Sequence, residues 1–202
     1  ENAEVADLMA RFEPLVKHFN RYLTIGGFPE LALSDDDLYA QRMLREDVVD
    51  KVIKRDVLTL FKVRSPLLME KLFLYLCMNS TEIFSATTAA KELDNISPNT
   101  IESYVDALVK SNLIYMAYPI AVGSKSVLKG RPKIYIADAA IRNAVLMVDD
   151  VLSDERELGL LIETTVYKHL VSFYQGTGAQ LGYYRKAKEN QKEVDAVIEL
   201  PQ

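Results

Sequence analysis

Three helix-starting signals in the middle of the chain restrict its fold more than any other feature. Ser65-Pro66 and Ser97-Pro98 each place a capping hydroxyl directly before a proline, which favours a helix start, and Ser85 caps a shorter segment between them. Apolar residues recur at three- and four-residue spacing in these segments. The sequence therefore predicts three helices, the last two joined by a short turn. Their apolar positions are Leu68, Met69, Leu72, Phe73, Leu76, Ala86, Ala89, Ala90, Leu93, Ile101, Tyr104, Val105, Leu108 and Val109.

Two β-strand patterns follow the third helix. The stretches "LIYMAYPI" and "PKIYIAD" are rich in β-branched and aromatic residues, and the segment "AVGSKSVLKGR" lies between them. Three helices followed by a pair of strands is the order of a winged helix-turn-helix, and the alanines of the second helix allow close packing of the third. The sequence therefore predicts a winged-helix domain over residues 63–148.

The charges of this predicted domain argue against sequence-specific DNA reading by the third helix. Glu102 and Asp106 are expected on its exposed face, and carboxylates repel a phosphate backbone. The segment between the strands is basic instead, although a solubilising loop has the same composition. We expect a protein-interaction or architectural role, with phosphate binding by the basic segment as the alternative. The candidate nucleic-acid-binding residues are Lys125, Lys129, Arg131 and Lys133.

Residues 1–62 form a predicted helical segment. A short helix is predicted over residues 1–20, and Gly26-Gly27 followed by Pro29 predicts a turn. A long helical run is predicted from about Asp35 onward, because apolar residues recur at helical spacing. Its charged stretch "REDVVDKVIKRDV" indicates a solvated face with salt bridges between residues four positions apart.

The acidic connector "DVLSDERELG" marks the start of a third unit, residues 149–202. A helix is predicted over residues 158–174, with Glu163 at the edge of its apolar stripe, and His169 is expected to be a core histidine. The strand "QLGYYR", the polar loop "KAKENQ" and a final strand that contains Asp195 follow. The predicted core stripe of the helix consists of Ile162, Val166, Leu170 and Phe173.

Glu163 on a helix and Asp195 on a following strand are the candidate catalytic and metal-binding residues. Magnesium prefers oxygen ligands from one or two carboxylates plus water, and phosphodiester hydrolysis uses such an ion with a positioned lysine. Surface carboxylates on a helix and a strand would give the same letters. The residues alone leave both interpretations open.

The overall composition limits the classes of partner. The chain of 202 residues has a net charge of −5, one cysteine and two histidines, so it has no internal disulfide and no zinc-type ligand cluster. A negative net charge argues against wrapping nucleic acid or an anionic membrane. No stretch approaches the roughly 18 apolar residues of a membrane span, and the first residues lack a signal-peptide pattern. We therefore expect a cytoplasmic location and no membrane partner.

Five stretches of the chain, in the same order, resemble one known family: "YLTIGGFPEL", "DVVDKVIKRDV", "KGRPKIYIADAAIRNA", "LGLLIETTVYKHL" and "YYRKAKENQKEVDAVIE". They are similar to the region that follows the P-loop domain in a large family of prokaryotic AAA-type ATPases. The final part of that region resembles the PD-(D/E)xK nuclease fold. The resemblance implies that Glu163 is the helix carboxylate and Asp195 the first strand carboxylate of this nuclease pattern. The family normally continues into a further strand with Glu-x-Lys, or a remnant of it, which this chain does not reach.

The resemblance implies a fragment of a longer parent protein, and ATP and Mg²⁺ are the cofactors it implies for that parent. No cofactor is expected in the fragment, because the G-x-x-x-x-G-K-[ST] phosphate loop is absent. We expect an α+β chain made of a helical segment, a winged helix-turn-helix and a truncated restriction-endonuclease-like α/β unit.

The expected function is that of a non-catalytic C-terminal region coupled to its own missing ATPase domain. The alternatives are a DNA-processing module with metal-dependent nuclease activity in the intact parent, and a winged-helix transcriptional regulator.

Overall fold

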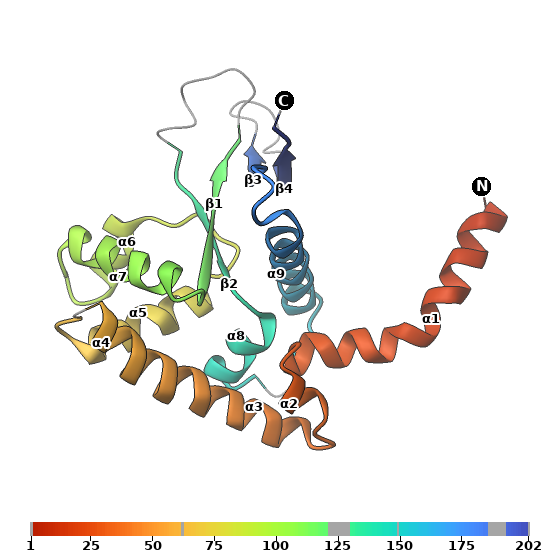
Figure 1. Cartoon of the computed structure of the whole chain (residues 1–202), viewed down its shortest axis with the longest axis horizontal. Coiled ribbons are helices and arrows are strands. Elements are labelled where there is room, and N and C mark those ends of the chain that lie inside the picture. The colour runs from red at the N-terminus through yellow and green to blue at the C-terminus, as the bar shows by residue number, and fades with distance from the viewer. Residues whose placement is uncertain (1, 62, 121–129, 149, 186–192, 202) are drawn as a thin grey trace.

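The structure is a mixed α+β fold, as the sequence predicts. The computed structural model describes residues 2–61, 63–120, 130–148, 150–185 and 193–201. Within these residues, helices lie around a four-stranded sheet, and the N-terminal helix extends away from the rest of the molecule (Figure 1). Across the same ranges, no helix combines the length and the hydrophobicity that a membrane span requires.

The N-terminal segment is helical, with a turn at the predicted glycine pair. Helix α1 (Asn2–Ile25) is longer than predicted and is followed by Gly26, whose φ of +77° is one that glycine readily adopts. A continuous helical run begins at Asp37, and its ion pair between Lys51 and Asp47 (2.5 Å) confirms the solvated face. The elements after the turn are α2 (Pro29–Ala32), α3 (Asp37–Arg45), the π-helix η1 (Glu46–Val57) and α4 (Leu58–Leu60).

The three helices predicted from the capping signals are present. They are α5 (Pro66–Met78), α6 (Ala86–Glu92) and α7 (Pro98–Lys110). The Ser65 hydroxyl accepts a hydrogen bond from the Leu68 amide and the Ser85 hydroxyl accepts one from the Thr88 amide, each at 3.3 Å. The Ser97 side chain makes no such bond, so α7 begins at its proline without a side-chain cap.

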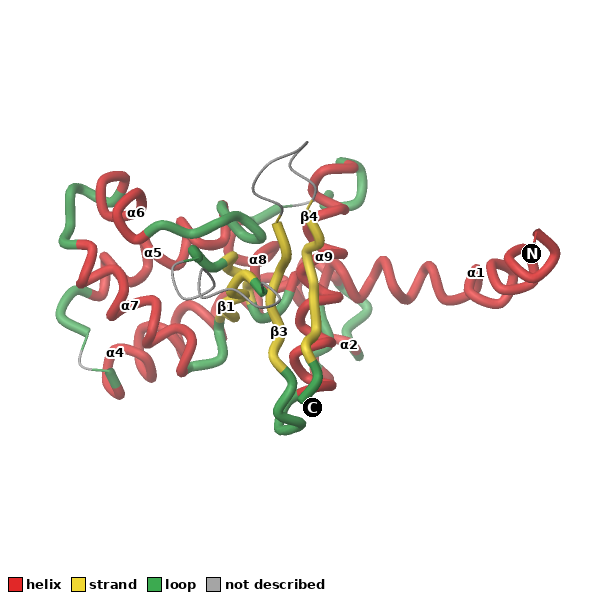
Figure 2. The backbone as a smooth tube through the Cα atoms, turned by 90° about the horizontal axis from the view of Figure 1, so that it is seen from above, coloured by secondary structure: helices red, strands yellow, loops and turns green. Residues whose placement is uncertain are grey.

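The described strands form one mixed sheet in the order β2-β1-β3-β4. Strand β1 (Ile114–Pro119) pairs with β2 (Lys133–Ile136) in antiparallel fashion, and β3 (Gln180–Arg185) pairs likewise with β4 (Glu193–Glu199). These two pairs are joined by a short parallel ladder between β1 and β3. Figure 2 shows β3 and β4 side by side, next to α9. Strands from residues 63–148 and residues 149–202 therefore share a sheet.

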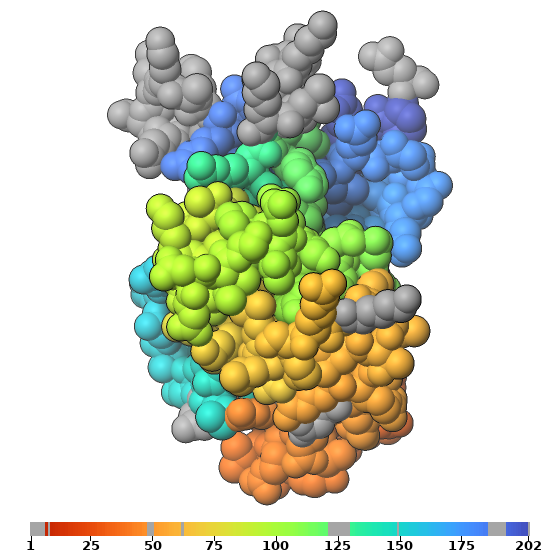
Figure 3. All heavy atoms as spheres, turned by 90° about the vertical axis from the view of Figure 1, so that its left-hand side faces the viewer, coloured from red at the N-terminus to blue at the C-terminus, as the bar shows by residue number. Residues whose placement is uncertain are grey.

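The largest hydrophobic core joins the helical run to the middle helices. Leu44, Ile53 and Val57 from the run lie in one buried cluster with Phe73 of α5 and Leu108 of α7, each at most 2% exposed. The run lies directly below the middle helices on the face that Figure 3 shows. The predicted helical segment and the predicted winged-helix unit therefore pack as one body.

Helix α8 (Ala139–Leu146) also packs into this core and carries a buried arginine. Arg142 is 4% exposed, and its guanidinium binds both carboxylate oxygens of Glu157, at 2.6 and 3.3 Å. It also donates to the carbonyl of Cys77 at 3.0 Å. A buried arginine is stable here because a carboxylate and a carbonyl satisfy it.

The prediction of the core stripe on helix α9 (Glu155–Tyr174) was wrong. Ile162, Val166 and Phe173 are 37%, 48% and 77% exposed. The buried face instead contains Leu161 and Tyr167, because α9 packs against β2 and stacks the Tyr167 ring on the Tyr135 ring, with 4.1 Å between centroids. Helical spacing identified an apolar face but could not tell which face meets the sheet.

Candidate functional site

Lys133 of β2 lies buried among three carboxylates. Its side chain is 7% exposed, and Nζ donates to Asp195 Oδ1 at 2.8 Å and to Glu163 Oε1 at 3.3 Å. It also forms an ion pair with Glu193. We call Lys133, Tyr135, Glu163, Glu193 and Asp195 the Lys133 cluster.

Three elements build this cluster. Lys133 and Tyr135 lie two positions apart on β2, and Glu193 and Asp195 lie two positions apart on β4, so each pair shares one face of its strand. Helix α9 contributes Glu163. The strands β2 and β4 are not neighbours in the sheet, and the long lysine side chain bridges the distance between them. The Lys133 Nζ atom lies 5.8 Å from the centre of the Tyr183 ring of β3, one of the strands between β2 and β4.

Tyr135 contacts the Glu163 carboxylate and the backbone of Asp195. Its hydroxyl lies 2.8 Å from Glu163 Oε1 and 3.3 Å from the main-chain oxygen of Asp195, and these two acceptors share its single proton. The ring is fully buried and stacks on Tyr167. Glu163 Oε1 therefore accepts from a neutral hydroxyl and from an ammonium group at once.

Burial and charge act on these groups in opposite directions. Burial alone would lower the pKa of Lys133, but hydrogen bonds to Asp195 and Glu193 outweigh it and raise that pKa above its ordinary value. Burial raises the pKa of Glu163, although the Tyr135 hydroxyl and the Lys133 charge oppose this effect. Lys133 is therefore a firmly charged cation at neutral pH, and it neutralises carboxylates that water reaches only in part.

The arrangement supplies a cation for the carboxylates but no evident metal site. Within the described ranges, no group of three or more histidine, cysteine, aspartate or glutamate side chains is placed to hold a metal ion. Arg185 adds a second basic group, 3.6 Å from Glu193. The Asp195 side chain is 52% exposed and is the part of the cluster most open to solvent.

The structure brings Glu163 and Asp195 together, because both carboxylates accept hydrogen bonds from the Lys133 amino group. Lys133, predicted as part of an exposed basic patch, lies inside the cluster instead, because its side chain enters the sheet face that the carboxylates occupy. Arg131 is exposed, and its carbonyl accepts from the Tyr183 hydroxyl at 2.8 Å. Lys125 and Lys129 lie outside the described residues. Phosphate binding by this patch stays a prediction.

Sequence reasoning missed Glu193 and Tyr135. Each lies two residues from a candidate, Glu193 before Asp195 and Tyr135 after Lys133, so period-two spacing was the available signal. This spacing was a weak signal, because the strands that contain Tyr135 and Glu193 are far apart in the sequence. The pairing of β1 with β3, which brings them together, has no mark in the sequence.

A second polar cluster joins α1 to α8 and α9. Lys168 Nζ forms an ion pair with Asp138, the capping residue of α8, and donates to the Tyr22 hydroxyl at 2.9 Å. The Tyr22 hydroxyl also lies 3.0 Å from His169 Nε2. His169 is exposed, so its prediction as a core histidine was wrong; it lies on the solvent side of α9, where its ring is 5.7 Å from the Tyr22 ring between centroids.

A family described as "Domain of unknown function (DUF8612)" matches residues 16–152. The chain belongs to this family. The match covers the helical run, the middle helices and β1, β2 and α8, and it ends before Glu163 and Asp195. Membership in DUF8612 therefore covers the middle of the chain, and it attaches no activity to the Lys133 cluster.

Several uncharacterised prokaryotic proteins are similar to this DUF8612 chain. Uncharacterized protein MJ1637 of Methanocaldococcus jannaschii is 30% identical over 175 residues, which is 85% of this chain and 36% of the relative. Uncharacterized protein MJ1544 of the same organism is 25% identical over 160 residues, 77% of this chain and 34% of the relative. Uncharacterized protein Rv2008c of Mycobacterium tuberculosis is 28% identical over 180 residues, 87% of this chain and 39% of the relative.

The chain thus spans between 34% and 39% of the length of these relatives. No solved structure matches it.

Replacing Glu163 by glutamine is expected to change the free energy of unfolding at neutral pH by less than about 1 kcal/mol. The amide oxygen can still accept from the Tyr135 hydroxyl, and the partly buried negative charge is gone. The wild-type contribution of Glu163 is fully present below the ordinary carboxyl pKa of about 4.3. Because the pKa of Glu163 is raised in the folded state, its contribution to stability is lost as the pH rises through that folded-state pKa.

Urea unfolding of the wild type and Glu163→Gln at a series of pH values measures this contribution. The free energy of unfolding of the wild type relative to the variant should fall as the pH rises from below about 4.3, which is the ordinary pKa of a glutamate carboxyl group. A constant difference across the series, or one that grew with pH, would contradict the raised pKa.

Proposed function

We propose that this chain is a non-catalytic C-terminal region of an ATP-binding protein. In this proposal the helical segment and the middle helices contact an ATPase domain and transmit its nucleotide state. The Lys133 cluster, in the part that resembles a nuclease, serves as a structural ion cluster.

The observation that carries this proposal is the position of the Lys133 ammonium. A metal-dependent nuclease uses its carboxylates to bind a divalent cation, which then activates water. Here Glu163 and Asp195 both bind Lys133 Nζ, at 3.3 and 2.8 Å. A metal ion would have to displace a buried, hydrogen-bonded cation before it could reach both carboxylates.

Exposed apolar side chains support a role in protein contact. One face of α1 leaves Met9, Phe12 and Phe19 exposed at 68%, 55% and 42%. The outward stripe of α9 adds Val166 and Phe173, and α1 and α9 meet where Phe19 and Val166 line one apolar hollow. Contiguous apolar surface of this kind is typical of an interface. The relatives, which are more than twice as long as the matched region, have room for a further domain.

The order of elements is consistent with the finer parts of the proposal. Helices α5, α6 and α7 followed by the antiparallel pair β1 and β2 have the order of a winged helix. Helix α9 followed by β3 and β4 has the order with which a PD-(D/E)xK unit begins. These agreements of order support the resemblance to the C-terminal region of AAA-type ATPases.

One observation favours a second candidate, a DNA-processing module in the intact parent. Glu163 and Asp195 come from distant parts of the sequence and converge on one point. That convergence is what a shared divalent cation would require. The cation at this point is the lysine, so we rank this candidate second.

Incubation of the purified chain with supercoiled plasmid DNA and Mg²⁺ or Mn²⁺, together with calorimetric titration with ATP, tests the proposal. We expect no cleavage and no ATP binding by the chain, whereas full-length MJ1637 is expected to bind ATP. Cleavage that Asp195→Asn abolishes would favour the second candidate. Failure of the full-length relative to bind ATP would overturn the proposed parentage.

A further inference from the structure

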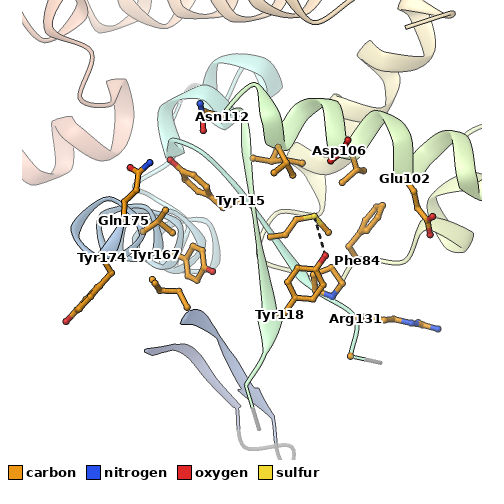
Figure 4. A pocket seen from close by; sticks show the side chains of 18 of the residues that line it. Phe84, Glu102, Asp106, Asn112, Tyr115, Tyr118, Arg131, Tyr167, Tyr174 and Gln175 are labelled. Carbon is orange, nitrogen blue, oxygen red and sulfur yellow. Dashed lines mark hydrogen bonds between the residues drawn. The ribbon is translucent and has the colours of Figure 1, made fainter. Parts of the chain in front are cut away.

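A large cleft separates the middle helices from the C-terminal end of α9. Its volume is about 1280 Å³, and its walls come from α7 and β1 on one side and from the end of α9 and the start of β3 on the other (Figure 4). It is distinct from the Lys133 cluster, since neither Lys133 nor its three carboxylates line it. The proposed function does not use this cleft.

The cleft exists because β1 and β3 diverge. Within the described residues, β1 and β3 pair only at Tyr118 with Gly182 and at Pro119 with Tyr183. The first part of β1 therefore has a described strand partner only on its β2 side. The Leu113 carbonyl accepts from the Ala137 amide, on the β2 side. Since backbone groups alternate along an antiparallel strand, those of Ile114 and Met116 point to the opposite edge. Both residues line the cleft; Ile114 is fully buried, and Met116 is partly exposed.

An open strand edge inside a cleft is a template for an added strand. Backbone groups on such an edge give affinity without reading a side chain, and the walls select the side chains that alternate along the added strand. Aromatic side chains lie on both sides of β1: Phe84 and Tyr118 on the side of α7, and Tyr115 on the side that faces Tyr167 of α9 (Figure 4). Aromatic faces attract cations as well as apolar groups.

The charges along the cleft select a basic occupant. Glu102 and Asp106 project from the exposed side of α7 along the wall (Figure 4). Asp106 is paired with Lys110 at 2.6 Å, whereas no side chain in the described part of the chain pairs with Glu102. Arg131 is the basic residue among those that line the cleft. Carboxylates on this wall repel nucleic-acid phosphates and attract lysine or arginine side chains.

We infer that this cleft binds an extended peptide segment with basic side chains, which adds a strand to the open edge of β1. The backbone groups of Met116, the partly exposed residue of this edge, pair with the peptide backbone. Glu102 binds a basic side chain of the peptide, and Tyr118 contacts the neighbouring one. The occupant is a segment of a partner protein and not a nucleic acid.

Fluorescence anisotropy with short labelled peptides tests this inference. The probe is a peptide of about six residues that alternates lysine and valine, matched to a typical strand length. Two controls isolate the causes: the same peptide with glutamate in place of lysine, and the lysine peptide with N-methyl groups on alternate residues. We expect saturable binding of the lysine peptide alone, with at least about fivefold weaker binding of the N-methylated form.

Matched variants of the protein locate the binding site. Glu102→Gln should weaken binding of the lysine peptide by about twofold to fivefold, as expected for one exposed ion pair. Glu92→Gln removes the same charge from an exposed position outside the cleft and should leave binding unchanged. Tyr118→Ala and Tyr39→Ala form a second pair, since the two side chains are 49% and 51% exposed and only Tyr118 lines the cleft.

Several results would overturn the inference. These are equal binding of the glutamate peptide, insensitivity to N-methylation, or equal effects of Glu102→Gln and Glu92→Gln. Tighter binding of a labelled DNA duplex than of the lysine peptide would also overturn it, in favour of a nucleic-acid surface. None of these results bears on the expected absence of ATP binding and DNA cleavage, so the two proposals fail independently.

Discussion

Replacing Lys133 by methionine is expected to lower the free energy of unfolding by about 2 to 4 kcal/mol at neutral pH. Methionine keeps most of the side-chain volume but leaves Glu163, Glu193 and Asp195 without their shared cation. Removing one partner of a buried ion pair typically costs about 3 to 5 kcal/mol. The lower range applies here because the Asp195 side chain is half exposed and water screens part of the repulsion.

Two controls separate the buried charge from a general loss of lysine. Lys71→Met removes an exposed lysine that pairs with Asp94 at 2.8 Å, and it should cost less than about 1 kcal/mol. Adding Asp195→Asn to Lys133→Met should recover part of the lost stability, because fewer negative charges then repel one another. Equal effects of Lys133→Met and Lys71→Met would contradict the account of the cluster.

The raised pKa of Lys133 fixes the pH range of its contribution. A raised lysine pKa gives a stabilisation that is fully present below the ordinary value of about 10.4 and is lost as the pH rises through the folded-state pKa. The difference between the wild type and Lys133→Met should therefore change little between neutral pH and that ordinary value. It should shrink only in more alkaline solution.

Replacing Gly182 by alanine is expected to lower the free energy of unfolding by about 3 kcal/mol, the upper part of the usual range for overpacking. A Cβ at this position would lie 2.0 Å from the Tyr118 carbonyl oxygen and 2.8 Å from the Ile120 side chain. The first atom belongs to the backbone of β1 and cannot rotate away. The variant must separate β1 from β3 at the only two residue pairs that join them in the described sheet.

Gly159→Ala is the matched control for this prediction. Gly159 lies on an exposed position within α9, and an added Cβ would meet no atom within 4 Å. Alanine should raise the free energy of unfolding there by about 0.5 to 1 kcal/mol, because glycine is unfavourable inside a helix. Chemical denaturation of both variants measures the contrast. A stabilising Gly182→Ala would show that β1 and β3 do not approach as closely as described.

The secondary structure was largely predictable because its signals are local. Ser65 and Ser85 cap helices as their positions indicate, and the glycine pair at the end of α1 makes the predicted turn. The strand "QLGYYR" coincides with β3. Caps, turns and strand patterns act over a few residues, so the sequence states them directly.

The environment of particular side chains was less predictable because it depends on how distant elements meet. Lys133 belongs to a basic stretch of sequence, which suggested an exposed patch, yet the sheet turns it toward the carboxylates. The aliphatic stripe of α9 looked like its core face, yet the Tyr167 face meets β2. Both outcomes follow from the short parallel ladder of β1 with β3, which no local pattern encodes.

The convergence of Glu163 with Asp195 was expected from the family resemblance and not from spacing. The resemblance suggested two carboxylates at one centre, and both contact Lys133 Nζ. What it did not suggest is that a lysine from β2 stands between them.

The central claim is that Lys133, and not a metal ion, neutralises these carboxylates, and thermal unfolding with and without Mn²⁺ tests it most directly. Binding of an ion to the folded state alone raises the melting temperature, by an amount that depends on its concentration. We predict that about 10 mM Mn²⁺ leaves the melting temperature of the wild-type chain unchanged. An increase of several degrees that Asp195→Asn abolishes would contradict the account.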